Sequence, residues 1–128
     1  NAHVLGETYF TQGALRYGDH IAKVSLAPES ANVRALTGQD MDVEDFSSIR
    51  DVVADFFSHE GAEYTLRAQL ATDLEQMPVE DASVLWDEEQ APHQPVATLR
   101  IAPQDTYSPR RRVYGDDVLT FNPWNGVV

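Results

Sequence analysis

Between Glu63 and Leu70, polar and apolar residues alternate without exception, and this constrains the fold more than any other part of the chain. The stretch places Tyr64, Leu66, Ala68 and Leu70 on one face and Glu63, Thr65, Arg67 and Gln69 on the other. A period of two is typical of a β-strand that buries one face and leaves the other in water. The sequence therefore predicts a half-buried strand here, with its apolar face packed on a core.

Three other segments have weaker strand patterns. Leu15–Leu26 alternates as far as Pro28, and Gly18 inside it indicates a bulge or a close backbone approach. Val96–Ile101 alternates again, and Val118–Phe121 forms a short apolar run that Pro123 ends. We expect these segments to join Tyr64–Leu70 in one mainly antiparallel sheet that buries four side chains: Tyr64, Leu66, Leu99 and Ile101.

The pattern changes to a helical one between Phe46 and Phe57. Apolar residues recur three and four positions apart, at Phe46, Ile49, Val53 and Phe56. Ser48 is a plausible N-cap, and Gly61 lies just beyond the expected end. We predict a helix near Ser48–Phe57 that packs Phe46, Val53 and Phe56 on its own domain rather than around a cofactor. The predicted fold class is thus α+β and β-rich: a sheet of about four strands with one main helix, in a single domain spanning residues 1–128.

The charge of the chain excludes several functions. Its 21 acidic and nine basic residues give a net charge of −12, whereas nucleic acid and anionic membranes require a basic surface. The chain has no cysteine, which excludes disulfides and thiolate chemistry. No apolar run approaches the ~20 residues of a membrane span, and no signal peptide is visible, so a cytoplasmic location is expected. The ends of the sequence favour a fragment of a longer protein, with residues 1–2 as a tag remnant.

Residues suited to catalysis are few. The four histidines, at positions 3, 20, 59 and 93, are far apart and form no metal-binding motif. Asp87-Glu88-Glu89 is better explained as a solvated loop than as a calcium site, because adjacent carboxylates point in different directions. Arg110-Arg111-Arg112 has two interpretations, an exposed loop tip or a site for a carboxylate or haem propionate. No catalytic residue and no metal ligand is predicted.

The segment from Met77 to Val128 has an ordered set of features that resembles a known family. Asp81-Ala82-Ser83 precedes Trp86, and the later features are Pro92, Pro95-Val96, Leu99, Ile101 and Phe121-Asn122-Pro123. This order resembles the late barrel segment of monofunctional haem catalases, and is more similar to the short bacterial catalase-like proteins. The resemblance implies the second half of a catalase-like β-barrel, and a parent protein that binds haem and acts on hydrogen peroxide or organic hydroperoxides.

The resemblance assigns one position beside the haem, Phe121. It places the distal histidine before the matched segment and the axial tyrosine after it, so the chain alone is expected to bind no haem. Arg110 and Tyr114 do have the R-x-x-x-Y spacing of the axial tyrosine motif. They precede the strand after which that motif is expected, however, and Pro109 and Gly115 argue against a helix there. Tyr114 is therefore not predicted to be an iron ligand.

Two function classes stay open: an inactive scaffold half of a catalase-like haem protein, and a free-standing acidic binding or assembly module. Half a barrel has strand edges and an apolar face that need a partner. That partner is either the missing half or a second copy, which gives a homodimer. The alternative is a monomer in which the helix at Phe46–Phe57 covers the open face.

Overall fold

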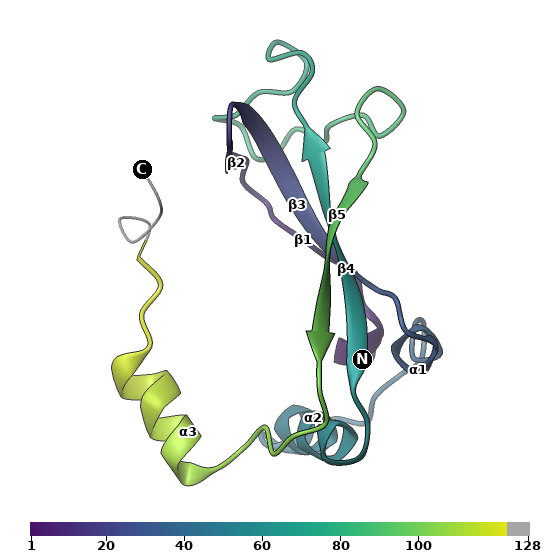
Figure 1. Cartoon of the computed structure of the whole chain (residues 1–128), viewed down its shortest axis with the longest axis vertical. Helices are drawn as coiled ribbons and strands as arrows, with labels where there is room; N and C mark the ends of the chain where they lie inside the picture. The colour runs from purple at the N-terminus through teal and green to yellow at the C-terminus, as the bar shows by residue number, and fades with distance from the viewer. Residues whose placement is uncertain (123–128) are drawn as a thin grey trace.

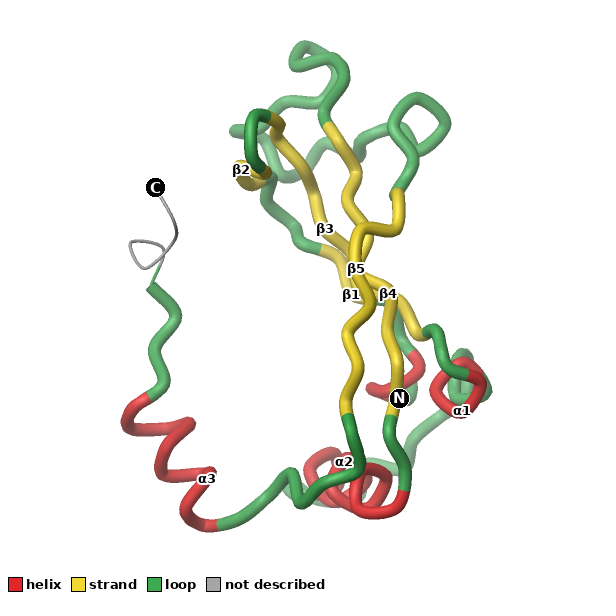
Figure 2. The backbone as a smooth tube through the Cα atoms, viewed as in Figure 1, coloured by secondary structure: helices red, strands yellow, loops and turns green. Residues whose placement is uncertain are grey.

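A computed structural model describes residues 1–122 of the chain, and it confirms the predicted fold class. One antiparallel sheet has the strand order β1-β3-β4-β5, and β2 pairs with β3 beside β1 (Figures 1 and 2). Its strands are β1 (Tyr9–Phe10), β2 (Leu15–Tyr17), β3 (His20–Pro28), β4 (Ala62–Leu70) and β5 (Gln94–Ile101). The helices are η1 (Val4–Gly6), α1 (Ala31–Arg34), α2 (Ser48–His59), α3 (Pro109–Val113) and the π-helical turn η2 (Tyr114–Val118).

The single strand predicted at Leu15–Leu26 is in fact a hairpin. β2 turns back onto β3 after Tyr17, which pairs with His20. Gly18 takes a positive φ of 61° at the first central position of this turn. A two-residue turn with that conformation suits the twist of the flanking strands and favours glycine. The alternation was identified correctly, but Gly18 forms a turn and not a bulge.

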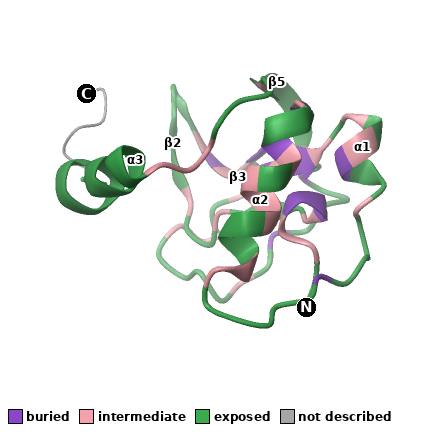
Figure 3. Ribbon diagram, turned by 90° about the horizontal axis from the view of Figure 1, so that it is seen from below, coloured by how far each residue is buried: buried purple, intermediate pink, exposed green. Residues whose placement is uncertain are grey.

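The main helix is confirmed, and with part of the sheet it forms the first of two small cores. Phe57 of α2 is buried in one cluster with Tyr64 of β4, and Val53 and Phe56 pack at the margin of this cluster. Figure 3, coloured by burial, shows buried segments beside α2. The prediction for Phe46 was wrong: its side chain is fully exposed, because the helix begins only at Ser48. Ser48 is not the N-cap either. Its hydroxyl accepts hydrogen bonds from the backbone N–H groups of Glu44 and Asp45, in the turn that leads into the helix.

The second core lies on the opposite face of the sheet. The connection between β4 and β5 folds over this face and buries Met77, Trp86 and Ala91 against it. For this reason Gln69, on the face predicted to be exposed, is only 3% exposed. Its amide Nε2 donates to the backbone carbonyls of Trp86 at 3.3 Å and Ala91 at 2.9 Å. Gln69, which lies on the polar face of β4, thus attaches the covering loop to the sheet.

Strand β5 forms one edge of the sheet and is largely exposed. It pairs with β4 from Ala62↔Ile101 to Ala68↔Gln94, with an irregularity beside Leu66. Tyr64 is buried as predicted, and Leu66 and Ile101 are half-buried, but Leu99 is 44% exposed. The prediction for Leu99 was wrong because Leu99, although it pairs with Tyr64, lies on an edge strand that has only one neighbouring strand. No further strand of the described residues covers β5.

The predicted strand at Val118–Phe121 is absent, and a helical arm occupies this part of the described chain. Pro109 is in the first turn of α3, where a missing N–H costs nothing, and the Ser108 hydroxyl accepts from the N–H of Arg111 as an N-cap. The argument that Pro109 and Gly115 prevent a helix was therefore wrong. The helix continues into η2, whose N–H of Leu119 donates to the carbonyl of Tyr114 at 2.8 Å. The arm leads away from the sheet (Figure 1).

Candidate functional site

The most chemically varied hollow lies where the β4–β5 connection covers the sheet. It has a volume of about 400 Å³. Aromatic, aliphatic and polar side chains share its wall, including Phe10, Lys23, Gln69, Leu85, Trp86 and His93. We call it the Trp86 hollow. Because an apolar wall with a few convergent polar groups is typical of small-molecule sites, this hollow is the first place to test for chemistry.

His93, in the wall of the Trp86 hollow, is paired with Ser25, which does not line the hollow. The hydroxyl of Ser25 lies 2.9 Å from Nδ1 of His93, and the ring of Phe10 meets the imidazole edge to face at 5.5 Å. Burial lowers the pKa of His93, which Glu88 raises and Arg67 lowers again, so the neutral ring is favoured. Ser25 is only 2% exposed, however. A substrate cannot reach its oxygen, so the pair positions the loop and is not a nucleophile with its base.

Trp86 and Lys23 form another part of the wall. The ammonium of Lys23 lies 4.8 Å from the centroid of the Trp86 ring and donates to the carbonyl of Val84 at 3.2 Å. Both contacts attach the loop to β3, since a cation over an aromatic face is attractive. The indole Nε1 of Trp86 is buried and has no hydrogen-bond partner within the described part of the chain. This wall therefore has one unused donor.

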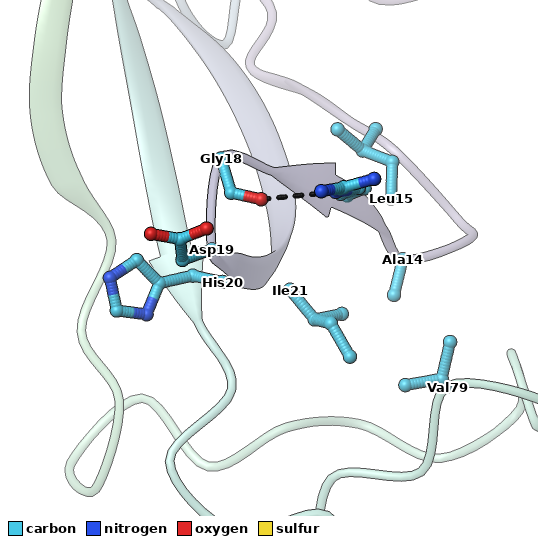
Figure 4. Close-up of a pocket in the computed structure, with 8 residues that line it drawn as sticks. Ala14, Leu15, Gly18, Asp19, His20, Ile21 and Val79 are labelled. Carbon is cyan, nitrogen blue, oxygen red and sulfur yellow. Dashed lines mark hydrogen bonds between the residues drawn. The ribbon is translucent and has the colours of Figure 1, made fainter. Parts of the chain in front are cut away.

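A second hollow lies at the β2–β3 hairpin (Figure 4). Asp19 and His20 lie next to each other on one side of the turn, while Ala14, Ile21 and Val79 line the other side. Arg16 is part of the same wall, but its Nε already donates to the carbonyl of Gly18 at 3.2 Å. The hollow is open to solvent, and the guanidinium of Arg16 is already hydrogen-bonded to the hairpin turn. This geometry suits a solvated hairpin better than a binding site.

The arm has a third hollow, of about 600 Å³, which includes Arg110 and Tyr114 in its wall. These two residues are one helical turn apart, on α3 and at the start of η2. The residues present do not enclose a haem: Tyr114 is 56% exposed and Phe121, the position assigned by resemblance, is 95% exposed. No step of haem chemistry can be derived from the described residues alone.

The other sequence candidates lie apart from one another. His3 accepts a hydrogen bond from the N–H of Leu5, and His59 lies on α2 within 3.9 Å of Asp55. Asp87 accepts from the N–H of Glu89 at 2.9 Å, as expected for a loop turn. Within residues 1–122, no group of three histidine or acidic side chains is placed to hold a metal ion.

The Trp86 hollow was not predicted from the sequence. Lys23, Ser25 and Gln69 lie on the face of β3 and β4 that the alternation predicts to be exposed. One signal was available, since the connection that follows β4 contains Met77, Leu85 and Trp86, and apolar side chains of that size have to pack on something. That signal predicts a covered second face but not which polar residues lie beneath the loop.

Comparisons with protein-family models, with curated proteins and with solved structures find no match for this chain. Among the described residues, no helix is both long enough and apolar enough to cross a membrane.

Proposed function

We propose that this chain is the scaffold half of a cytoplasmic, catalase-like haem protein whose parent processes hydrogen peroxide or organic hydroperoxides, and that the chain alone is inactive. The order of features from Asp81 to Pro123 supports the family assignment. One structural observation supports the role of an incomplete half: β5 is an eight-residue edge strand whose outer side has no partner among the described residues. In a closed barrel such an edge would be paired by the next strand.

The exposed surface of the chain also supports this proposal. A compact protein of 14.3 kDa has an accessible surface of about 6,800 Å², whereas this chain has 9481 Å². The difference, about 2,700 Å², is more than one partner normally contributes to a stable interface. On this proposal, the missing half of the barrel covers that surface and provides the residues that enclose haem beside Phe121.

Haem loading tests the proposal. The chain produced together with its complementing barrel half should give a Soret band at one haem per complex and should consume hydrogen peroxide. The 128-residue chain alone, titrated with haemin, should give neither. A complex that binds no haem would contradict the proposal. Stoichiometric ferric-tyrosinate haem in the chain alone would contradict its second part, and loss of that spectrum in Tyr114→Phe would identify Tyr114 as the ligand.

A second candidate function is a free-standing acidic module for binding or assembly. The distribution of charge favours it. Of the 21 acidic residues 19 precede Pro109, as do six of the nine basic ones, which gives residues 1–108 a net charge of −13. The arm from Pro109 to Asn122 has three arginines and two aspartates, a net charge of +1. An acidic body with a weakly positive arm suits contact between copies, which peroxide chemistry does not require.

A further inference from the structure

The arm formed by residues 109–122 has exposed apolar side chains that nothing in the described chain covers. Val113, Tyr114, Val118, Leu119 and Phe121 are between 48% and 95% exposed. So short a helix is not stable in water by itself and is normally held by packing of its apolar side chains. Arg110 and Arg111 form no ion pair among the described residues, whereas Arg112 pairs with Asp116 at 3.4 Å. The arm thus presents apolar and cationic groups that require a partner.

A surface of complementary character lies on the β4–β5 connection. The segment from Thr72 to Gln90 has seven acidic residues and no basic one, and none of the seven forms an ion pair within the described residues. It also exposes two leucines, Leu74 at 60% and Leu85 at 93%. We call this segment the acidic loop. Carboxylates beside exposed leucines complement arginines beside exposed aromatic and aliphatic groups.

In Figure 1 the arm lies apart from the acidic loop of its own chain. Its base is fixed near α2, since the N–H of Gln104 donates to the carbonyl of Phe57 at 2.6 Å and the guanidinium of Arg50 lies 4.5 Å from the ring of Tyr107. The acidic loop is at the other end of the sheet (Figure 1). Strand β5, which separates the two ends, has eight residues and is about 26 Å long.

We propose that the arm of one chain docks on the acidic loop of a second copy, in a twofold dimer whose β5 strands lie antiparallel edge to edge. A twofold axis perpendicular to β5 places the α2 end of one chain beside the acidic loop of the other, and it does so twice. The same arrangement pairs the two open edges. The excess surface of about 2,700 Å² per chain is enough for such an interface. This inference rests on the second candidate function, the assembly module.

Charge exchange between the two surfaces tests the dimer in the 128-residue chain. Light scattering of the unmodified chain at 50–100 μM, roughly the range in which a weak dimer forms, should give about twice its 14.3 kDa, and added salt should lower that mass. The double variant Arg110→Glu/Arg111→Glu should be monomeric, as should Glu88→Lys/Glu89→Lys. An equimolar mixture of the two variants should restore the dimer, because both arm–loop contacts are then attractive. Arg34→Glu, an exposed charge reversal on α1, makes half that change of net charge away from the arm and should stay dimeric.

Each result supports or overturns the inference. A mass near 14.3 kDa for the unmodified chain at all these concentrations would overturn it. A dimer that persists in both double variants would overturn the arm–loop contact, as would a failure of the mixture to associate when circular dichroism shows that both variants are folded. Haem binding is measured in a separate experiment, with the complementing barrel half present. Failure of the dimer and failure of the catalase-like proposal are therefore distinguishable.

Discussion

Gln69→Leu should destabilise the chain far more than its position on the polar face of a strand suggests. The Gln69 side chain is 3% exposed, and its amide Nε2 is the donor to two backbone carbonyls of the β4–β5 connection. Leucine has a similar volume, so the substitution removes the donor and creates little cavity. Both carbonyls then lose a partner in a buried place, where each unsatisfied acceptor costs about 1–3 kcal/mol.

The two hydrogen bonds do not contribute equally. The bond to Ala91 is 2.9 Å long, whereas the bond to Trp86, at 3.3 Å, is beyond the usual range and weak. Most of the cost therefore comes from Ala91. We expect the free energy of unfolding to fall by about 2–3 kcal/mol, a large part of the 5–15 kcal/mol typical of a domain. Because Trp86 is held by the same loop, its fluorescence should shift to longer wavelength below the unfolding transition. The measurement uses Trp124→Phe in every protein compared, so that Trp86 is the only tryptophan.

Urea unfolding at one fixed protein concentration measures this loss, since ΔG is linear in denaturant. The matched control is Gln76→Leu, which makes the same chemical change at an exposed position of the same connection. A Gln69→Leu midpoint within the error of the Gln76→Leu midpoint would mean that these hydrogen bonds contribute little to stability. A destabilised Gln69→Leu variant whose Trp86 emission matches that of the protein with Gln69 would mean that Gln69 does not hold the loop.

The hydroxyl of Tyr64, the imidazole of His93 and the turn at Gly18 should each affect stability in a measurable way. Tyr64→Phe should cost about 1 kcal/mol in urea unfolding because the buried hydroxyl donates to the carbonyl of Leu5 at 2.8 Å, while Tyr9→Phe should cost less, since its bond to Val4 is exposed. Lowering the pH from about 7.5 to 5.5 should destabilise the chain. The pKa of His93 in the folded state lies below the ordinary value of about 6.5, so the unfolded state binds the proton more readily as the pH falls. His93→Phe should flatten the dependence of stability on pH. Gly18→Ala should cost about 1–2 kcal/mol because φ is 61°, whereas Gly13→Ala, with open space around it and no positive φ, should be nearly neutral.

The sheet and α2 could be predicted from the sequence because their patterns are local. The period of two in β4 and the period of 3.6 in α2 each act through neighbours a few residues away. The turn at Gly18 has the same local origin, and only its type was misjudged. What covers each face of the sheet depends on long-range contacts that periodicity does not encode. The predicted burial was therefore too low for Gln69 and too high for Leu99. Gln69 is covered by a loop, whereas Leu99 on the edge strand stays 44% exposed.

The arm was mispredicted for a different reason. Val118–Phe121 was expected to be a strand, and Pro109 was interpreted as a helix breaker. At the first turn of a helix proline is favoured instead, and Ser108 before it completes an N-terminal signal that is visible in the sequence. The candidate site residues were predicted less well than the fold. Phe121 was assigned by resemblance alone, and its ring is exposed among the described residues.

The two small cores have a consequence for how stability should be measured. One core packs α2 on the Tyr64 end of the sheet and the other packs the connection on the Gln69 end, while β5 and the arm contribute little to either. If a partner covers β5 and the arm, binding stabilises only the folded state, by an amount that rises with the logarithm of partner concentration. For a second copy, the unfolding midpoint should therefore rise with the concentration of the chain itself. For a barrel half encoded elsewhere in the parent protein, it should depend only on added complement. A midpoint that depends on neither would mean that the two small cores hold the fold by themselves and that the exposed edge has no partner.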